Sequence, residues 1–414
     1  MTTTPHHEVL PEAPAAAPTA LPWRHLAVLS FAAFWTVTLE MLPAGLLPQI
    51  SRDLDVRPAR VGLLVTVWAV AVGLSSLPLT RLTRSWSRPT ALAAGLAVLG
   101  VASVASALAP TFAGVLAARL VAATGHGLFW SVLMVYAASL APAGREARAI
   151  SVVLSGPVLA GVVGLPLGTL LGGPLGWRWV IGAVSVSLVV GAVLVRTQMP
   201  EGRSTPDGDP SPARGEGVRD ESAARVWRIA LLGALALVAH FGAFTYIAPL
   251  VEGRWSSGVP DVGVLLLAFG IAGAVGLAAV GLVADRAAPE RVLLVAVVSI
   301  ALTFWLLTVT TDTMAVLAAV VVWGLLIGAL PPALQGAVIG AASPAYRNTA
   351  GAVLVAVFNL GIAFGAATGG VVIERVGLGA LLPLAAAVAT VSAVGLAASS
   401  RRSAGESLTP PARP

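Results

Sequence analysis

One acidic residue lies inside an otherwise uncharged stretch near the start of the chain. Residues 26–50 contain Glu40 as their single charged side chain. About 20 apolar residues in a helix are enough to cross a bilayer, and a carboxylate within such a span costs about 2.5–3.5 kcal/mol on insertion scales. We therefore expect Glu40 to face protein or water and to be able to carry a proton. The alternative is a polar anchor bonded to a neighbouring helix, since Pro43 and Pro48 mark local irregularity.

Two basic side chains lie in another apolar stretch, ARLVAATGHGLFWSV (residues 118–132). Arg119 is about eight residues inside the predicted span 112–140 that contains this stretch, or about 12 Å deep at 1.5 Å per residue. It could pair with an anion such as Glu40, or extend its side chain to the membrane surface. His126, near mid-membrane, could titrate, contact a substrate, or bond a carbonyl of a neighbouring helix. We treat Glu40, Arg119 and His126 as the candidate proton-coupling group.

The second half of the chain offers uncharged polar groups in apolar stretches. His240 and Tyr246 lie in HFGAFTYIAPL (residues 240–250), and Gln335 and Asn359 lie in two later stretches. Such groups could bind a substrate with hydroxyls or amides, although each alone could equally bond a neighbouring helix. These four are the candidate substrate-binding residues.

Enzymatic and metal chemistry are not favoured. Cysteine is absent, which excludes disulfides, thiol nucleophiles and thiolate metal sites. The membrane stretches offer Glu40, Arg119, His126 and His240, which are spread over three spans and do not form a ligand set. We expect neither an enzyme, nor a metal site, nor a cofactor beyond a proton gradient. A membrane-embedded enzyme remains a weak alternative.

The composition is that of an integral membrane protein. Hydrophobic residues make up 57% of 414, charged residues make up 11%, and the mean hydropathy is +0.89. Because the apolar runs lack the alternation of a barrel, they are predicted to be helices. The fold class is therefore all-α with twelve transmembrane helices. The runs cover residues 26–50, 61–79, 89–109, 112–140, 149–172, 178–197, 226–250, 262–284, 292–311, 314–341, 350–373 and 377–398.

One long polar connection divides these runs into two sets of six. We expect a disordered tail over residues 1–22, a first six-helix half over 23–197, a linker over 198–225, a second half over 226–400 and a tail over 401–414. Arginine supplies all 25 basic residues. If the N-terminus is placed in the cytoplasm, 18 arginines fall on the cytoplasmic side of the membrane and six on the other side. Because cytoplasmic loops carry an excess of basic residues, this count predicts that both termini are cytoplasmic.

Two motifs suggest packing and gating. In the fifth run Gly156, Ala160, Gly164, Gly168 and Gly172 recur every four residues, which places small residues along one helix face and permits close helix packing. Prolines such as Pro166 can bend that helix. The connection GLVADRAAPER (residues 281–291) carries Asp285 and Arg286, which could pair across a cytoplasmic gate. The earlier connection at residues 76–90 keeps only the basic groups Arg81, Arg84 and Arg88. Gating there would rest on these arginines alone, and the alternative is a solvated loop.

These blocks together resemble a known family. Four blocks carry the resemblance: LEMLPAGLLPQI, HGLFWSV, VVGLPLGTLLGGPLGWRW and FTYIAPL. They are similar to the sugar efflux and arabinose-efflux-like permeases, a branch of the twelve-span drug:proton antiporters in the major facilitator superfamily. The resemblance covers about residues 23–400. It implies two pseudo-symmetric halves and export of a small molecule, a sugar or drug-like compound, against proton entry, with Glu40 as the first-span acid.

The resemblance also implies a place and partners. We expect a monomer in the bacterial inner membrane, whose partners are a small-molecule substrate and the lipid bilayer, with no nucleic acid. A uniporter or an importer on the same fold remains open.

Overall fold

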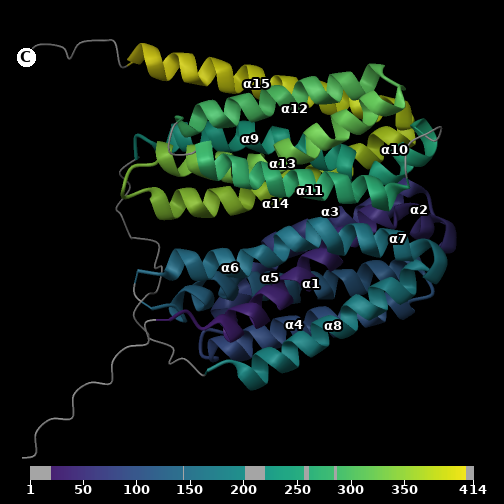
Figure 1. Cartoon of the computed structure of the whole chain (residues 1–414), viewed down its shortest axis with the longest axis vertical. Coiled ribbons are helices and arrows are strands. Elements are labelled where there is room, and N and C mark those ends of the chain that lie inside the picture. The colour runs from purple at the N-terminus through teal and green to yellow at the C-terminus, as the bar shows by residue number, and fades with distance from the viewer. Residues whose placement is uncertain (1–19, 143, 201–219, 256–260, 284–286, 407–414) are drawn as a thin grey trace, which may run out of the picture.

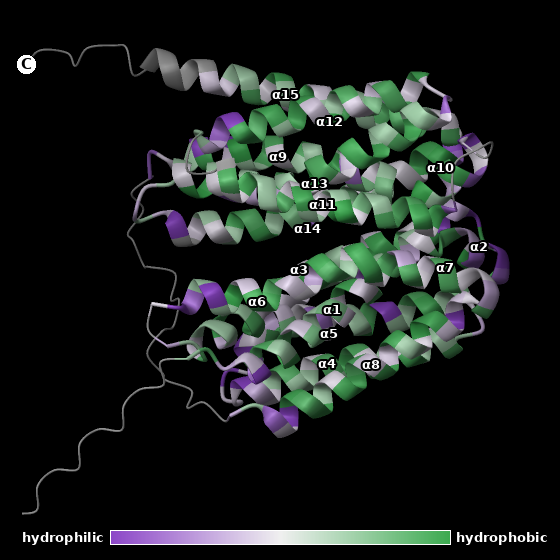
Figure 2. Cartoon of the chain, in the orientation of Figure 1, coloured by the Kyte–Doolittle hydropathy of each residue, from purple (hydrophilic) through white to green (hydrophobic). Residues whose placement is uncertain are grey.

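The protein folds almost entirely into helices. The computed structural model describes residues 20–142, 144–200, 220–255, 261–283 and 287–406. Within these ranges twelve helical spans are long and apolar enough to cross a membrane, which confirms the predicted fold class. Figure 2 shows hydrophobic residues along the spans and hydrophilic residues gathered near their ends. The long helices are α1 (Trp23–Gly45), α3 (Pro58–Leu82), α4 (Arg88–Leu108), α5 (Phe112–Ser139), α6 (Glu146–Leu159) continued by the π-helix η1 (Ala160–Gly164) and α7 (Leu165–Leu175), α8 (Trp177–Gln198), α9 (Ala223–Phe244), α11 (Val262–Val283), α12 (Pro289–Val309), α13 (Thr313–Ala341), α14 (Arg347–Arg375) and α15 (Leu381–Glu406).

Three short helices complete the described chain: α2 (Leu47–Asp53), α10 (Ile247–Arg254) and η2 (Leu378–Ala380). The first predicted run, residues 26–50, is broken at Leu46, whose φ of −97° and ψ of 6° separate α1 from α2. The seventh run breaks in the same way before α10. Both breaks lie where the chain turns at the end of a span.

The helices form two bundles that face each other (Figure 1). In the first bundle, α4 packs against α5 and α8, and α6 packs against α1; in the second, α12 packs against α13 and α15, and α14 packs against α9. Between the bundles, α3 lies along α14, and α11 packs against η1 and α7.

The bundles meet mainly toward one end of the molecule. We call the end where α8 finishes and α9 begins the linker end, and the other the far end. At the far end the Tyr246 side chain lies against Gly62 of α3 and Gly370 of α14, and its hydroxyl donates to the Ala366 carbonyl at 2.9 Å. Gly270 of α11 lies against the backbone of Gly161. Toward the linker end the ribbons of α6 and α14 diverge (Figure 1).

The glycine ridge of the fifth span lies along α1. A side chain at Gly156 would meet the Ser30 backbone of α1, and one at Gly164 would meet Thr38. Gly168 and Gly172 face Leu42 and Leu46 in the same way. The two helices run in the same direction, and the contacting residues recur at intervals of four or eight on both. The small residues of the fifth span therefore let α1 pack closely against it from Ser30 to Leu46. The π-helix lies inside this span, and π turns in α-helices are frequent at functional sites.

Candidate functional site

Glu40 lies on the face of α1 away from the glycine ridge. Residues 38 and 40 are about 200° apart around a helix of 3.6 residues per turn, and Thr38 faces Gly164. The Glu40 carboxylate instead approaches α5, where its Oε2 lies 3.5 Å from Nε2 of His126. The Glu40 side chain is 28% exposed and that of His126 is 6% exposed. The acid predicted from the sequence therefore lies beside His126, another member of the candidate proton-coupling group, whereas the partner suggested for it from the sequence was Arg119.

Arg119 is buried, so its guanidinium does not extend to the membrane surface. Its Cζ lies over the Trp68 ring of α3, 4.4 Å from the ring centroid. Such cation–π contacts contribute about 0.5–2 kcal/mol, depending on desolvation. Nε and Nη2 of Arg119 make no hydrogen bond. The guanidinium contacts Trp68, whose ring meets that of His126, the residue beside Glu40. Arg119 therefore lies in the same cluster as the carboxylate, and no ion pair joins the two among the described residues.

Trp68 contacts both basic members of this group. Arg119 lies over one face of its ring, and the His126 ring meets it at a steep angle, with centroids 5.2 Å apart. The indole N–H of Trp68 is buried and makes no hydrogen bond. Trp68 is 2% exposed. The sequence interpretation did not include this residue.

The candidate substrate residues of the second bundle lie apart from this group. His240 is buried, and its Nδ1 accepts a hydrogen bond from Nε1 of Trp323 at 3.1 Å. Tyr246 is engaged with Ala366 at the far end. Gln335 is exposed on α13, and Asn359 donates to the Val355 carbonyl of its own helix at 3.0 Å. Among the described residues, no hydrogen bond or ring contact joins these four to Glu40, Arg119 or His126.

The candidate gating residues are only partly visible. Arg81 and Arg84 are exposed at the linker end of α3. Asp285 and Arg286 lie outside the described residues. Pro166 is the second residue of α7, which follows the π-helix directly, and its carbonyl lies beside Gly263 of α11. The fifth span therefore contacts α1 on one side and the second bundle on another.

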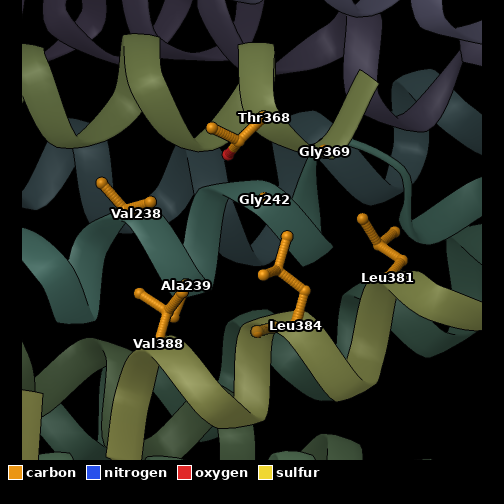
Figure 3. Close-up of a pocket in the computed structure, with 9 residues that line it drawn as sticks. Val238, Ala239, Gly242, Thr368, Gly369, Leu381, Leu384 and Val388 are labelled. Carbon is orange, nitrogen blue, oxygen red and sulfur yellow. The ribbon is translucent and has the colours of Figure 1, made fainter. Parts of the chain in front are cut away.

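Two cavities in the described residues do not include the charged group. The first, between α9, α14 and α15, measures about 10 Å³, which is room for about one water molecule. Figure 3 shows its lining of apolar side chains with Thr368 as a polar member, and that hydroxyl donates to its own helix. The second is an apolar groove of about 540 Å³ between α3 and α5. No cluster of three or more potential metal ligands occurs in the part of the chain that the structure describes.

The chain resembles bacterial transporters along most of its length. It is 33% identical over 407 residues to a chloramphenicol efflux pump of Mycobacterium tuberculosis, covering 95% of this chain and 97% of that protein. It is 32% identical to an uncharacterized MFS-type transporter of Bacillus subtilis, covering 85% of this chain and 89% of that one.

Solved structures share the fold at lower identity. A bacterial homologue of the human lysosomal transporter Spinster, in an inward-facing and occupied conformation, matches with a TM-score of 0.70 at 17% identity, covering 92% of this chain and 98% of that chain. A peptide transporter in complex with sulfate matches with a TM-score of 0.75 at 13% identity, covering 92% and 94%. A family model described as Major Facilitator Superfamily matches residues 27–366 and 255–414. The chain is a transporter, not an enzyme, and belongs to the Major Facilitator Superfamily.

Proposed function

We propose that this protein exports a small drug-like molecule or sugar in exchange for protons, and that Glu40 carries the proton. The observation that carries the proposal is the placement of Glu40 within 3.5 Å of His126, next to an Arg119 that is buried without a hydrogen bond on Nε or Nη2. A partly buried carboxylate and a buried guanidinium that lie in one cluster without an ion pair can exist in two arrangements, paired and unpaired. Intramembrane ionisable groups of this kind mark proton relays.

The two arrangements provide a cycle. While Arg119 rests on Trp68, the low-dielectric surroundings favour the neutral, protonated Glu40. When the bundles rock and Arg119 reaches the carboxylate, the ionised form is favoured and the proton leaves. His126 supplies a nearby nitrogen to which the proton can pass. Export follows if substrate binds in one of these states and leaves in the other.

The substrate contacts belong to the second bundle in this proposal. Gln335 and Asn359 offer amide groups, and His240 and Tyr246 add a ring nitrogen and a hydroxyl once their present partners are displaced. These four candidate substrate-binding groups are uncharged and polar, which suits a neutral substrate. Because a relative is named as a chloramphenicol efflux pump, chloramphenicol is the first compound to test.

The remaining sequence predictions complete the proposal. We place the protein as a monomer in the bacterial inner membrane with both termini in the cytoplasm, so that the linker end is cytoplasmic. Arg81, Arg84, Asp285 and Arg286 then lie on the cytoplasmic side as gate residues. Gly156, Gly164, Pro166 and Gly168 shape the fifth span against α1.

The test is transport by purified protein in proteoliposomes with radiolabelled chloramphenicol. Glu40→Gln keeps the shape of the side chain, so exchange at equal concentrations should persist. Accumulation driven by an imposed pH gradient should fall by at least about tenfold, within the 5–150-fold range of typical coupling energies. Gln335→Ala is the matched control, because it should weaken chloramphenicol exchange without uncoupling it from protons.

A Glu40→Gln protein that still concentrates chloramphenicol against its gradient as well as the native protein would contradict the proposal. The proton would then be carried by another group.

A further inference from the structure

We infer that Trp68 is the positioning residue of the coupling group: its indole holds the Arg119 guanidinium away from the Glu40 carboxylate and so keeps the proton site in its unpaired arrangement. The inference rests on the proposal that Glu40 carries the proton. It names a residue of α3 that the sequence interpretation did not include.

The first step is the geometry of Arg119. Its charge is buried at 3% exposure, and an arginine so placed is expected to pair with an available carboxylate. Instead the Cζ lies 4.4 Å from the centroid of the Trp68 ring, while Nε and Nη2 stay without hydrogen bonds. The aromatic face is therefore the contact that replaces the ion pair in this structure.

The second step is the position of the ring itself. Trp68 is almost fully buried and its edge meets the His126 ring at 5.2 Å between centroids. His126 in turn lies 3.5 Å from the Glu40 carboxylate. One rigid side chain with two rotatable bonds therefore touches both the arginine and the histidine beside the acid, and a shift of α3 moves both contacts together.

The third step links the ring to the motion of the bundles. Trp68 lies on α3 between Gly62, which contacts Tyr246, and Gly73, which contacts Asn359 of α14. Because α3 is the helix of the first bundle that packs along α14, rocking of the second bundle acts on the same helix that carries the ring. Displacement of Trp68 would free Arg119 to reach Glu40.

The charged groups that face Glu40 come from one helix. Arg119 and His126 both belong to α5. The stretches 61–80 of α3, 149–177 of the fifth span and 179–195 of α8 contain no acidic or basic residue. Short helices α2 and α10 carry Arg52, Asp53, Glu252 and Arg254 only near their ends. A change in the protonation of Glu40 after substitution of Trp68 is therefore expected to act through Arg119 or His126.

The experiment measures Glu40 protonation directly, without substrate. The infrared absorption of protonated carboxyl groups is followed against pH in the purified full chain, and the Glu40→Gln variant assigns the share that belongs to Glu40. Trp68→Leu and Trp68→Met remove the aromatic face in two ways, so the result does not depend on the folding of one variant. Trp68→Phe keeps a face for Arg119 and loses the N–H.

Loss of the face should let Arg119 pair with Glu40, so the midpoint of Glu40 protonation should move to lower pH by about one unit, the low end of the effect of an adjacent arginine on a carboxylate. Trp68→Phe should move it by less than about half of that. In an Arg119→Gln background, Trp68→Leu should cause no further shift, because the two residues act through one contact. Phe269→Leu is the matched control and should leave the midpoint unchanged, because Phe269 follows Trp68 by 201 residues and lies on α11, the helix of the second bundle that corresponds to α3.

Two results would overturn the inference: a native midpoint in both Trp68→Leu and Trp68→Met, or a shift that persists in full without Arg119. These outcomes are separate from the failure of the proposed function. If Glu40→Gln transported normally, Glu40 would not be the proton carrier, yet the infrared midpoint would still report whether Trp68 controls the pairing of Arg119.

Discussion

The glycine ridge of the first bundle has a counterpart in the second bundle at a constant distance along the chain. Gly365 and Gly369 of α14 follow Gly164 and Gly168 by 201 residues, and they pack against α9 as the first pair packs against α1. The helices keep the same offset, since α4 begins at Arg88 and α12 at Pro289. Packing of the backbone is therefore repeated in both halves.

The polar group is not repeated. At the same offset of 201 residues, Phe241 follows Glu40, Val320 follows Arg119 and Ile327 follows His126. In place of charges, the second bundle has an aromatic cluster around His240, in which Trp323 donates to the histidine and Phe269 stacks on it with the ring planes 4° apart. Phe269 occupies the position that Trp68 holds in the first bundle.

This difference indicates a division of labour. A repeated scaffold lets the two bundles rock against each other symmetrically, whereas ionisable groups inside a membrane are costly and are kept only where they act. In the proposed function, the charges of the first bundle bind and release the proton, and the neutral polar groups of the second bundle bind the substrate. The predictions below test both halves of that statement.

The largest effect, loss of folding, should come from a large side chain on the ridge, and the cost of a single added methyl should depend on what it meets. At Gly156 and Gly365 an added methyl would meet backbone atoms, whereas at Gly164 it would meet the Thr38 side chain, which can rotate. We expect Gly156→Ala and Gly365→Ala to destabilise the protein by about 1–3 kcal/mol, the usual cost of overpacking, and Gly164→Ala to cost less. Leucine should abolish folding at all three positions.

Thermal unfolding in detergent, followed by light scattering, measures this order. Equal stability of the alanine variants at Gly156 and Gly164 would show that the distinction between backbone and side-chain contacts is wrong.

The second effect concerns a carboxylate placed in the wrong bundle. Phe241→Glu puts an acid at the counterpart of Glu40, where the positions matching Arg119 and His126 are apolar. The substitution should cost about 2.5–3.5 kcal/mol, as on insertion scales, and should not restore pH-driven uptake to a Glu40→Gln protein. The measurement is chloramphenicol accumulation in proteoliposomes by the double variant, and restored accumulation would mean that either bundle can carry the proton.

The ridge and the acid were predictable from the sequence, but the contacts of Arg119 were not. Periodicity of small residues every four positions and a lone Glu40 in an apolar run are local patterns, and the structure places both in helices. Whether Arg119 pairs with Glu40 or rests on an aromatic ring depends on how α1, α3 and α5 pack. The spacing of residues within one helix carries no information about that packing. The contact between Trp68 and Arg119 could therefore not be predicted from the sequence.

The π-helix and the helix breaks were also beyond the sequence. Glycines at four-residue intervals are compatible with a regular helix, and the π turn at Ala160–Gly164 arises where that helix also meets Gly270 of the other bundle. The break at Leu46 falls inside a continuous apolar run. Hydropathy detects burial in lipid, but it does not detect where a buried helix changes direction.

The third effect compares the two buried histidines. His126→Phe removes a titratable nitrogen beside Glu40 and should reduce proton–substrate coupling by about tenfold, within the usual range of coupling energies. His240→Phe removes the acceptor of Trp323 and should weaken chloramphenicol affinity by about two- to tenfold, the value of one hydrogen bond, with the pH dependence of exchange unchanged. Exchange rates across a series of pH values separate the two variants. A changed pH profile in His240→Phe would contradict the division of labour.

The smallest effect lies at the linker end of the second bundle. Asp220 accepts hydrogen bonds from Ser222 and from Ser343 at 2.5 Å, and these bonds lower the pKa of its carboxyl below the usual 3.8. The counterpart of Ser343 in the first bundle is Pro142, which has no hydroxyl. Because the folded-state pKa is depressed, this contribution to stability is present above pH 3.8 and is lost as the pH falls through the folded value.

Asp220→Asn should therefore unfold at a slightly lower temperature than the native protein at neutral pH, and the difference should vanish in acid. The measurement is the unfolding temperature of both proteins at neutral pH and below pH 3.8. A difference that persists unchanged in acid would show that the carboxylate is not the source.

The central claim is that the proton of the transport cycle resides on Glu40 of the first bundle. It is tested most directly by proton release on substrate binding, measured with a pH indicator in weakly buffered detergent solution as chloramphenicol is added to purified protein. The native protein and His240→Phe should release protons, and Glu40→Gln should bind chloramphenicol without releasing any. Equal release by Glu40→Gln and the native protein would contradict the account.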